Sequence, residues 1–285
     1  MKKKKIILLV SSFFFIFWLV QAQRTMKFRE PDDKAKKEFD SLGIVLTTKT
    51  IRANNFNLHF AQVGNDTMPT LFFVHGSPGS WNVFKHYLQD KELLRRYRMI
   101  SVDRPGFGYS EFNHAKNLEE QSTIISHLLR AIQNNQPIFL IGHSLGGPLI
   151  AKLDIDNPGL ASGLVILAGS LDPTAEKPEK WRPILFKTPL NYLLPGAWRP
   201  SNRELWYLKN DLRILDKNLD KVTCAVWLVH GDKDNLVPFR NLSYAKEKLK
   251  NARRVEVTVL HNANHFIPWT HFTEIKQILL RLSEK

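Results

Sequence analysis

A serine at the centre of a G-x-S-x-G motif is the residue of this sequence best suited to nucleophilic chemistry. Ser144 lies between Gly142 and Gly146, directly after the apolar run 138–141 and before a segment with helical spacing. This strand-turn-helix context is the one that the motif requires, because a sharp turn exposes the hydroxyl and the glycines avoid collisions with neighbouring backbone. The turn also leaves the backbone N–H of Leu145 at a helix N-terminus, aimed at a developing oxyanion. The motif predicts nucleophilic catalysis by Ser144.

A serine nucleophile needs a histidine to accept its proton and a carboxylate to orient that histidine. His265 is the predicted base, because it lies in a loop between the apolar run 255–260 and the last segment with helical spacing. His261 is the rival, but it still lies at the end of that run. Three aspartates that follow apolar runs could supply the carboxylate: Asp172, Asp232 and Asp234.

Eight short segments have the composition of β-strands, and most of them alternate with segments of helical spacing. The first two are expected to form a hairpin with Asn54 and Asn55 in its turn. The later ones are apolar on both faces, as expected of central parallel strands with helices on each side. The order predicts an α/β fold, a mostly parallel eight-stranded sheet flanked by helices. The predicted strands are 44–53, 56–63, 71–74, 99–102, 138–141, 164–167, 225–229 and 255–260, and the predicted helices are 82–96, 118–134, 145–156, 240–250 and 270–283.

Five motifs make the sequence similar to the α/β-hydrolase superfamily over nearly all of residues 44–285. They follow apolar strands in the order that this family uses: H-G-S-P-G-S at 75–80, D-R-P-G-F-G-Y-S at 103–110, G-H-S-L-G-G at 142–147, G-D-K-D-N-L-V-P at 231–238 and N-A-N-H-F at 262–266. The resemblance implies the α/β-hydrolase fold. It does not fix the activity, because this superfamily supports many chemistries on one scaffold.

The resemblance also implies roles for individual residues. It assigns the acid of the catalytic triad to Asp234 and makes Asp232 a turn residue that binds its own backbone. Asp172 stays an alternative, because some family members place their acid after the preceding strand. The backbone N–H of Ser77, which follows the strand 71–74, would be the second oxyanion donor beside that of Leu145.

The serine at the turn narrows the expected reaction. Family members that open epoxides or displace halide use an aspartate there and form an alkyl ester, whereas Ser144 would form an acyl-enzyme. The expected reaction is therefore acyl transfer to water. No cofactor is implied, and the sequence contains no H-E-x-x-H motif or clustered carboxylates that would indicate a metal site.

Residues 171–220 separate two predicted strands and are about three times longer than a simple crossover needs. The segment contains six prolines and many large apolar side chains, which predicts a small helical cap inserted after the sixth strand. The core would then comprise residues 23–170 and 221–285. The cap leaves the sheet at the end where Ser144 lies, so some of its side chains should line the substrate pocket. The candidates are Trp181, Trp198 and Trp206.

Residues 1–22 have the pattern of a secretory signal peptide. Lys2 to Lys5 are followed by the apolar run 6–20, and Val20-Gln21-Ala22 predicts cleavage between Ala22 and Gln23. The body would then be exported to a periplasm or the extracellular space. The alternative is an uncleaved N-terminal anchor, which would keep the protein at a membrane. A loose association with a membrane fits either form.

Composition excludes several classes of protein. With 285 residues, 43% of them hydrophobic, the chain can bury one large core, and a single cysteine, Cys224, rules out an internal disulfide framework. The formal net charge of +14 is expected to reflect a solvated basic surface and not a nucleic-acid site, because no basic cluster is interleaved with stacking aromatic residues. We expect a monomer or homodimer whose partner is a small acyl substrate.

Three functions fit these features. The first is an exported serine esterase or lipase-like hydrolase for a partly apolar ester or related acyl bond. The second is a peptidase of the proline-iminopeptidase type, which also has an H-G-x-P-G stretch but uses a larger cap with carboxylates that hold the substrate amine. The third is a catalytically idle binding protein on the same fold, which a complete set of Ser144, Asp234 and His265 argues against.

Overall fold

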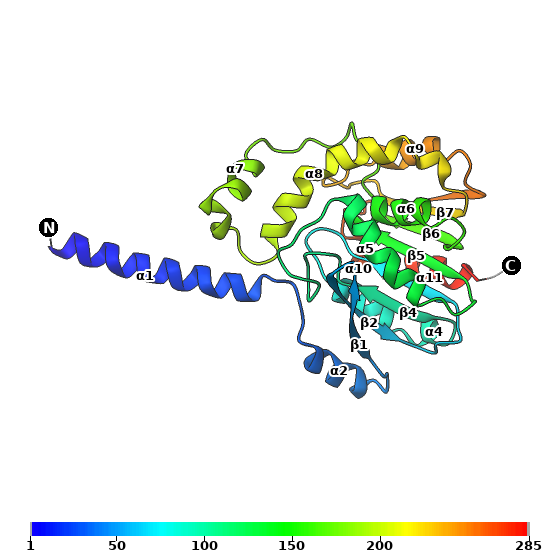
Figure 1. Ribbon diagram of the computed structural model, residues 1–285, viewed down its shortest axis with the longest axis horizontal. Helices are drawn as coiled ribbons and strands as arrows, with labels where there is room; N and C mark the ends of the chain where they lie inside the picture. The colour runs from blue at the N-terminus through cyan, green and yellow to red at the C-terminus, as the bar shows by residue number, and fades with distance from the viewer. Residues whose placement is uncertain (1, 284–285) are drawn as a thin grey trace.

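A computed structural model describes residues 2–283 and contains one eight-stranded sheet (Figure 1). The order across the sheet is β1-β2-β4-β3-β5-β6-β7-β8. Strand β2 is antiparallel to β1 and β4, and all other neighbours are parallel. The predicted mostly parallel sheet of eight strands is therefore confirmed. The strands are β1 (Thr47–Ala53), β2 (Phe56–Val63), β3 (Thr70–Val74), β4 (Arg98–Val102), β5 (Ile138–His143), β6 (Gly163–Leu167), β7 (Ala225–Gly231) and β8 (Arg254–Leu260).

Alternate residues of the central strands enter two separate cores, one on each face of the sheet. In β3, Phe72 and Val74 belong to one core, whereas Leu71 and Phe73 belong to the other. Every residue of β3, β4, β5 and β6 is buried, which explains why these strands are apolar without alternation.

Helices cover both faces of the sheet. The first core is closed by α5 (Leu118–Ala131), α6 (Gly146–Asp156) and α9 (Arg240–Lys248). The second is closed by α2 (Asp32–Ser41), η1 (Trp81–Phe84), α3 (Lys85–Leu88), α4 (Lys91–Leu94), α10 (Ile267–Thr270) and α11 (Phe272–Arg281).

The predicted helix 82–96 is wrong as a single element, because the chain forms η1, α3 and α4 in its place. The break occurs at Asp90, whose side chain accepts hydrogen bonds from the backbone N–H groups of Glu92 and Leu93 at 2.9 Å each. An aspartate in this position caps a new helix and competes with continuation of the old one.

The segment after β6 contains α7 (Arg182–Lys187), η2 (Pro189–Leu193), α8 (Trp198–Asp216) and η3 (Leu219–Lys221). The C-terminal half of α8 places Leu208, Leu212 and Leu215 in the first core. By contrast, α7 and η2 contain no buried residue. The segment is therefore fixed to the body by α8.

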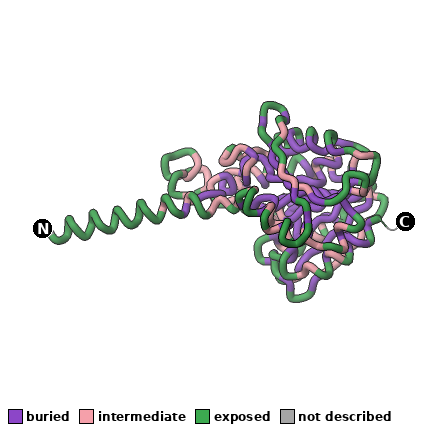
Figure 2. Tube along the Cα trace, turned by 90° about the horizontal axis from the view of Figure 1, so that it is seen from below, coloured by how far each residue is buried: buried purple, intermediate pink, exposed green. Residues whose placement is uncertain are grey.

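The N-terminal helix α1 (Lys2–Thr25) projects away from the body on the side of α7 and α8 (Figure 1). Almost all of it is exposed, in contrast with the buried sheet (Figure 2). By length and composition alone, α1 is long enough and apolar enough to cross a membrane.

Candidate active site

Ser144 occupies a sharp turn between β5 and α6. Its φ is 55°, in the left-handed region that a residue with a β-carbon rarely adopts. The backbone N–H of Ser144 donates to the carbonyl of Leu167 in β6 at 2.9 Å, and that of Gly147 donates to the carbonyl of Ser144 at 2.9 Å. These bonds hold the strained turn, and the side chain of Ser144 remains half-buried and accessible.

The glycines on each side of Ser144 make this turn possible. A β-carbon on Gly142 would collide with the backbone of Gly146, and one on Gly146 would collide with the carbonyl of Val74. The loop after β3 approaches equally closely, because a β-carbon on Gly76 would lie 2.9 Å from the Ser144 Cβ. Gly76 is therefore packed directly against Ser144, which brings the neighbouring Ser77 close to it.

Two backbone N–H groups beside Ser144 are free to bind an anion. In the described part of the chain, neither Leu145 nor Ser77 donates its backbone N–H to a protein acceptor. Leu145 is 2% exposed, and a buried N–H without a partner is rare in folded proteins. This is the arrangement that an oxyanion hole requires before substrate binds.

Asp234 and His265 form a buried hydrogen-bonded pair. His265 donates its Nδ1–H to the Asp234 Oδ2 at 2.7 Å. The other oxygen, Oδ1, accepts from the backbone N–H groups of Leu236 at 2.9 Å and Val237 at 2.8 Å. The carboxylate is thus fixed by its own turn, and it leaves the Nε2 of His265 available as a proton acceptor.

A second histidine on this carboxylate was missed by sequence reasoning. The Nε2 of His230, at the end of β7, lies 3.4 Å from the Asp234 Oδ2 and donates to the carbonyl of Val237 at 3.0 Å. Burial would raise the pKa of Asp234, but the hydrogen bonds from His230 and His265 outweigh it and hold this pKa well below its usual value. Asp234 therefore stays ionised beside His265. The position of His230, four residues before Asp234, is the sequence feature that could have indicated this contact.

His143 packs beneath the predicted base. It donates its Nε2–H to the carbonyl of His265 at 3.0 Å, and the two rings lie 4.8 Å apart. Burial, and then the neighbouring His265, lower the pKa of His143 to about 3. His143 is therefore neutral near neutral pH, and it orients the loop of His265 without adding charge. Within residues 2–283, no hydrogen bond joins the Ser144 hydroxyl to His265, a contact that often tightens only when substrate binds.

The rival residues are engaged elsewhere. Asp172 accepts from the Arg240 Nε at 2.8 Å and from the backbone N–H of Thr174 at 2.7 Å. Asp232 lies 3.1 Å from the His261 Nδ1, on the surface, and accepts from the backbone N–H of Asn262 at 2.7 Å. The structure thus brings Asp234, and neither alternative, to His265.

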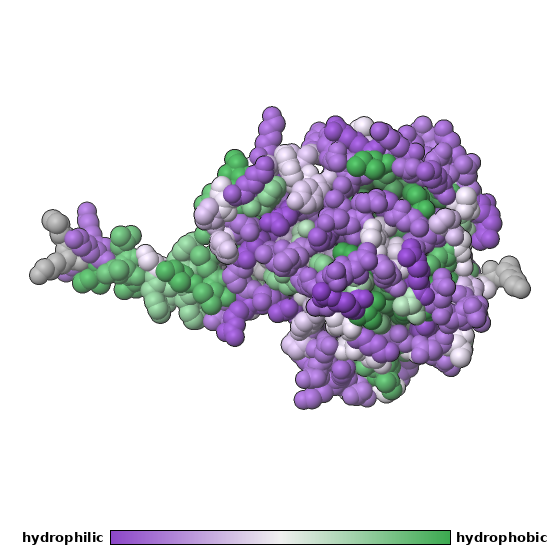
Figure 3. Space-filling model, viewed as in Figure 1, coloured by the Kyte–Doolittle hydropathy of each residue, from purple (hydrophilic) through white to green (hydrophobic). Residues whose placement is uncertain are grey.

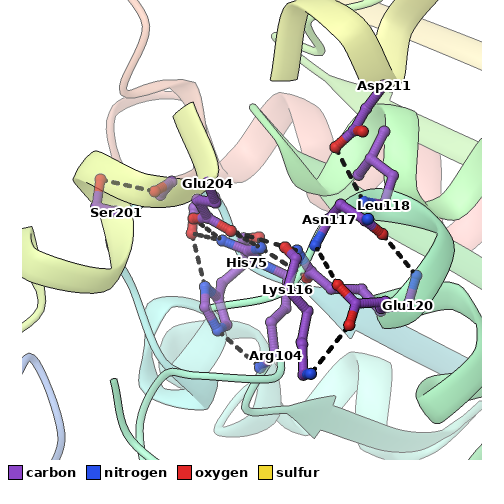
Figure 4. A network of polar contacts seen from close by, with 12 residues as sticks. His75, Arg104, Lys116, Asn117, Leu118, Glu120, Ser201, Glu204 and Asp211 are labelled. Atoms are coloured by element: carbon purple, nitrogen blue, oxygen red, sulfur yellow. Dashed lines mark hydrogen bonds and ion pairs between the residues drawn. The ribbon is translucent and has the colours of Figure 1, made fainter. Parts of the chain in front are cut away.

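A buried ion pair connects α8 to the loop of Ser77 (Figure 4). Arg104 is fully buried and donates to both carboxylate oxygens of Glu204, at 2.8 and 2.9 Å. The same guanidinium donates to the carbonyls of His75 at 2.8 Å and Gly76 at 2.9 Å. His75 in turn accepts the backbone N–H of Arg104 on its Nε2 at 3.0 Å. This network fixes the backbone that presents the Ser77 N–H.

Two further contacts tie α8 to the body. The Ser77 hydroxyl donates to that of Ser201 at 2.8 Å, and Asp211 accepts the backbone N–H of Leu118 at 3.0 Å, at the start of α5 (Figure 4). Helix α8 is therefore hydrogen-bonded both to the loop that contains Ser77 and to the start of α5.

Glu204→Gln is expected to lower the free energy of unfolding by about 3 kcal/mol, because it leaves the Arg104 charge buried without its partner. Denaturant titration measures this loss. The matched control is Glu179→Gln, which removes a half-exposed partner of Arg182 and should cost less than about 1 kcal/mol. Equal losses of unfolding free energy in the two variants would contradict the claim that the buried pair of Arg104 and Glu204 stabilises the fold.

The three tryptophans proposed to bind substrate differ in exposure. Trp181 and Trp198 are 47% and 43% exposed, and Trp206 is half-buried. Trp198 contacts the ring of Phe28, and the guanidinium of Arg182 lies over Trp181. Their role in substrate binding stays a prediction. Two other exposed aromatic residues, Phe266 and Trp269, are 49% and 41% exposed and contact His265 and His143 respectively.

Comparison with known proteins gives consistent matches. A family profile described as alpha/beta hydrolase fold matches residues 69–194. The chain is 36% identical over 126 residues to a pimeloyl-(acyl-carrier protein) methyl ester esterase of Shewanella oneidensis, covering 44% of this chain and 43% of that protein. It is 26% identical over 143 residues to epoxide hydrolase 1 of Caenorhabditis elegans, covering 49% and 35%. The matches span less than half the length of these curated relatives.

A solved structure extends the likeness of the fold. An esterase from Exiguobacterium antarcticum superposes with a TM-score of 0.68 at 18% identity, covering 84% of this chain and 100% of that one. At this identity the match concerns the fold alone.

Proposed function

This chain belongs to the α/β-hydrolase superfamily, and we propose that it is a serine hydrolase that cleaves a carboxylic ester or a related acyl bond through an acyl-enzyme. The observation that carries the proposal is the strained turn at Ser144, which stands between two unpartnered backbone N–H groups. The Asp234–His265 pair supplies the base. Turnover of p-nitrophenyl esters tests the proposal, and prolyl-arylamides tested beside them separate an esterase from an iminopeptidase.

The proposed reaction has two half-reactions. The Ser144 Oγ attacks the substrate carbonyl carbon while its proton passes to the His265 Nε2. The resulting oxyanion accepts hydrogen bonds from the backbone N–H groups of Leu145 and Ser77. Collapse breaks the acyl bond, and the leaving group takes the proton from His265. Water then attacks the acyl-enzyme with His265 again as base, which releases the acid and restores Ser144. Asp234 stabilises the transient imidazolium throughout.

The serine argues against epoxide opening as the activity. The similarity to an epoxide hydrolase covers only half of this chain, and the residue at the turn is Ser144, where epoxide-opening members of the superfamily have an aspartate. A serine alkoxide attacking an epoxide would form an ether that water cannot readily hydrolyse. An acyl substrate gives an ester intermediate, which water does hydrolyse.

The rate is expected to fall on the acid side along a single ionisation, because the base must be neutral to accept the Ser144 proton. Burial, and then the charge of Arg104, hold the pKa of His75 well below its usual value, and His143 is also held neutral. These two histidines therefore add no second titration. A profile of kcat/KM between pH 4.5 and 8 checks this ~one-proton slope. A flat profile, or a two-proton slope, would contradict a lone histidine base.

The substrate is proposed to have an apolar acyl or alcohol part, because exposed Phe266 and Trp269 lie beside the base. Each methylene that becomes buried contributes about 0.8 kcal/mol, so kcat/KM should rise up to about fourfold per carbon from acetate to hexanoate esters. Steady-state kinetics along this series measures the trend. A preference for acetate would refute the apolar pocket.

The helix α1 supports delivery to a membrane. The lysine cluster Lys2 to Lys5 forms its N-terminal end, which favours that end staying inside while the body lies on the other side. We propose that α1 directs export of the body, as a signal peptide or as an anchor.

A further inference from the structure

The cap segment presents an apolar surface that the described chain leaves open. Six large side chains within residues 181–198 are between 43% and 69% exposed. They come from α7, η2 and the residues that flank these two elements. Neither α7 nor η2 contains a buried residue. Hydrophobic residues are visible on the cap beside α1 (Figure 3). We name this set the apolar cap surface, and it consists of Trp181, Ile184, Leu190, Tyr192, Leu193 and Trp198.

The C-terminal end of α1 is fixed to this surface by a single side chain. Gln23 donates its Nε2 to the carbonyls of Tyr192 at 3.1 Å and Leu194 at 3.0 Å. Its Oε1 accepts from the backbone N–H of Gly196 at 3.1 Å and from Arg199 at 3.0 Å. The side-chain amide of Gln23 thus forms hydrogen bonds through both its nitrogen and its oxygen. These bonds place the C-terminal end of α1 next to η2.

The chain around Met26 reinforces this attachment. The backbone N–H of Ala197 donates to the Met26 carbonyl at 2.7 Å, and the approach is so close that a β-carbon on Gly196 would collide with that carbonyl. The φ of Gly196 is 52°, a conformation that glycine adopts readily. The junction is therefore built for direct contact between the two segments.

The dimensions of α1 suit a membrane span that ends at this junction. The candidate span, Lys3–Thr25, contains 23 residues, and 6% of an 18-residue apolar window within it is buried. At about 1.5 Å per residue the span is ~35 Å long and its apolar run 6–20 is ~22 Å long, against a hydrocarbon thickness of about 30 Å, so the lysines at one end and the polar residues at the other reach the two interfaces. The helix also continues through Ala22 and Gln23, the predicted cleavage site, and Ala22 is buried.

We propose that α1 is retained as an anchor and that the apolar cap surface lies in the interfacial layer of the same bilayer. Because Gln23 holds η2 at the point where the apolar part of α1 ends, Leu190, Tyr192 and Leu193 lie at the depth of that layer. Tryptophan and tyrosine favour this zone because one end of each ring system is apolar and the other binds water. Trp181, Tyr192 and Trp198 supply such residues.

Basic side chains near the junction favour anionic lipid. Arg24, Lys27 and Arg199 surround it, and partial burial together with the neighbouring charges of Arg29, Arg24 and Arg199 lowers the pKa of Lys27. Lys187, at the end of α7, is exposed. The nearby acid Glu179 is engaged with Arg182 at 2.6 Å. The surface is thus apolar at its centre and mainly positive at its edge, which matches an anionic leaflet.

A second copy of this chain is the rival occupant. It could cover the cap, but the exposed apolar side chains of α1 would still require lipid. The apolar cap surface is attached to α1 through the Gln23 junction, so a bilayer that surrounds α1 would also lie against the cap. We therefore commit to lipid as the partner.

The test is site-specific fluorescence in the full-length chain. The only cysteine, Cys224, is replaced by alanine, and an environment-sensitive NBD label is attached at Leu193→Cys. The matched controls are Val45→Cys, a 78% exposed apolar position in the body, and Phe15→Cys in α1. Each protein is reconstituted in vesicles of phosphatidylcholine with phosphatidylglycerol, with and without nitroxide-labelled lipid. Intact mass establishes whether α1 is present.

We expect lipid nitroxide to quench the labels at Phe15 and Leu193 at least threefold more than the label at Val45. Lys187→Glu should reduce quenching at Leu193 in anionic vesicles and leave it unchanged in phosphatidylcholine alone. Quenching at Leu193 no greater than at Val45, with Phe15 quenched, would overturn docking of the cap. Loss of residues 1–22 would also overturn the proposal. A disulfide that forms between the Leu193→Cys thiols of two copies, in unlabelled protein treated with a thiol oxidant, would overturn it as well if the labelled protein shows no lipid quenching. None of these readouts depends on hydrolysis.

Discussion

Ser144→Ala is expected to reduce kcat for ester hydrolysis by about 10⁴-fold or more, because no acyl-enzyme can form without the hydroxyl. We expect the fold to survive, because the hydrogen bonds that hold the turn come from the backbone of Ser144 and not from its half-buried side chain. Alanine can occupy the same left-handed turn at similar cost to serine. Steady-state kinetics and circular dichroism of both proteins measure the two expectations.

The matched control for this substitution is Ser243→Ala, which changes an exposed serine on α9 and should leave kcat unchanged. The residual rate of Ser144→Ala is informative as well. The unpartnered N–H groups of Leu145 and Ser77 would still stabilise an oxyanion formed by direct attack of water. A rate within tenfold of the unmodified protein would exclude Ser144 as the nucleophile.

Asp234→Asn is the second large effect, with kcat expected to fall on the order of 10³–10⁴. The asparagine oxygen can keep the bonds from Leu236 and Val237, but the carboxylate that accepts the Nδ1–H of His265 is lost. His265 then no longer has its Nε2 oriented as a base, and the imidazolium loses its counter-charge.

Asp172→Asn and Asp232→Asn are the controls, because the structure places these carboxylates against Arg240 and His261. Each should change kcat less than about tenfold, in line with a structural role. The three variants compared by steady-state kinetics therefore locate the acid. If Asp172→Asn were the most damaging, the acid would have to be moved to that position.

The sheet could be predicted from the sequence because its central strands are buried on both faces. Uninterrupted apolar runs of four or five residues, such as 71–74 and 164–167, have no other stable location in a soluble domain. The segment 82–96 was predicted less well. Its apolar spacing is helical, but the local hydrogen bonds of Asp90 divide it, and spacing alone does not report such competition.

Some residues of the site can be predicted from the local sequence, and others depend on residues that are distant in the sequence. Ser144 is defined by its own turn, so its five-residue motif predicts its place. The pair of Arg104 with Glu204 depends on residues brought together across the fold, because the two are 100 positions apart in the sequence. A buried charge such as Arg104 follows the ordinary rule that it must be paired, but the sequence does not name the partner.

The acid lay between these cases. Asp172, Asp232 and Asp234 all follow strands that end at the same edge of the sheet, so each could reach His265 on sequence grounds. The choice depends on how the turn after β7 bends. The hydrogen bonds that the backbone N–H groups of Leu236 and Val237 donate to Asp234 turn its carboxylate toward His265, and the sequence pattern does not reveal this bend.

The most direct test of the central claim is to map the covalent adduct of a fluorophosphonate by peptide mass spectrometry. If Ser144 is the nucleophile, we expect about one adduct per chain, on the peptide that contains Ser144, with loss of ester hydrolysis in proportion to labelling. The strained turn and the free N–H groups of Leu145 and Ser77 select this hydroxyl over every other serine. An adduct on a different residue, or ester hydrolysis that continues in fully labelled protein, would contradict a serine nucleophile at position 144.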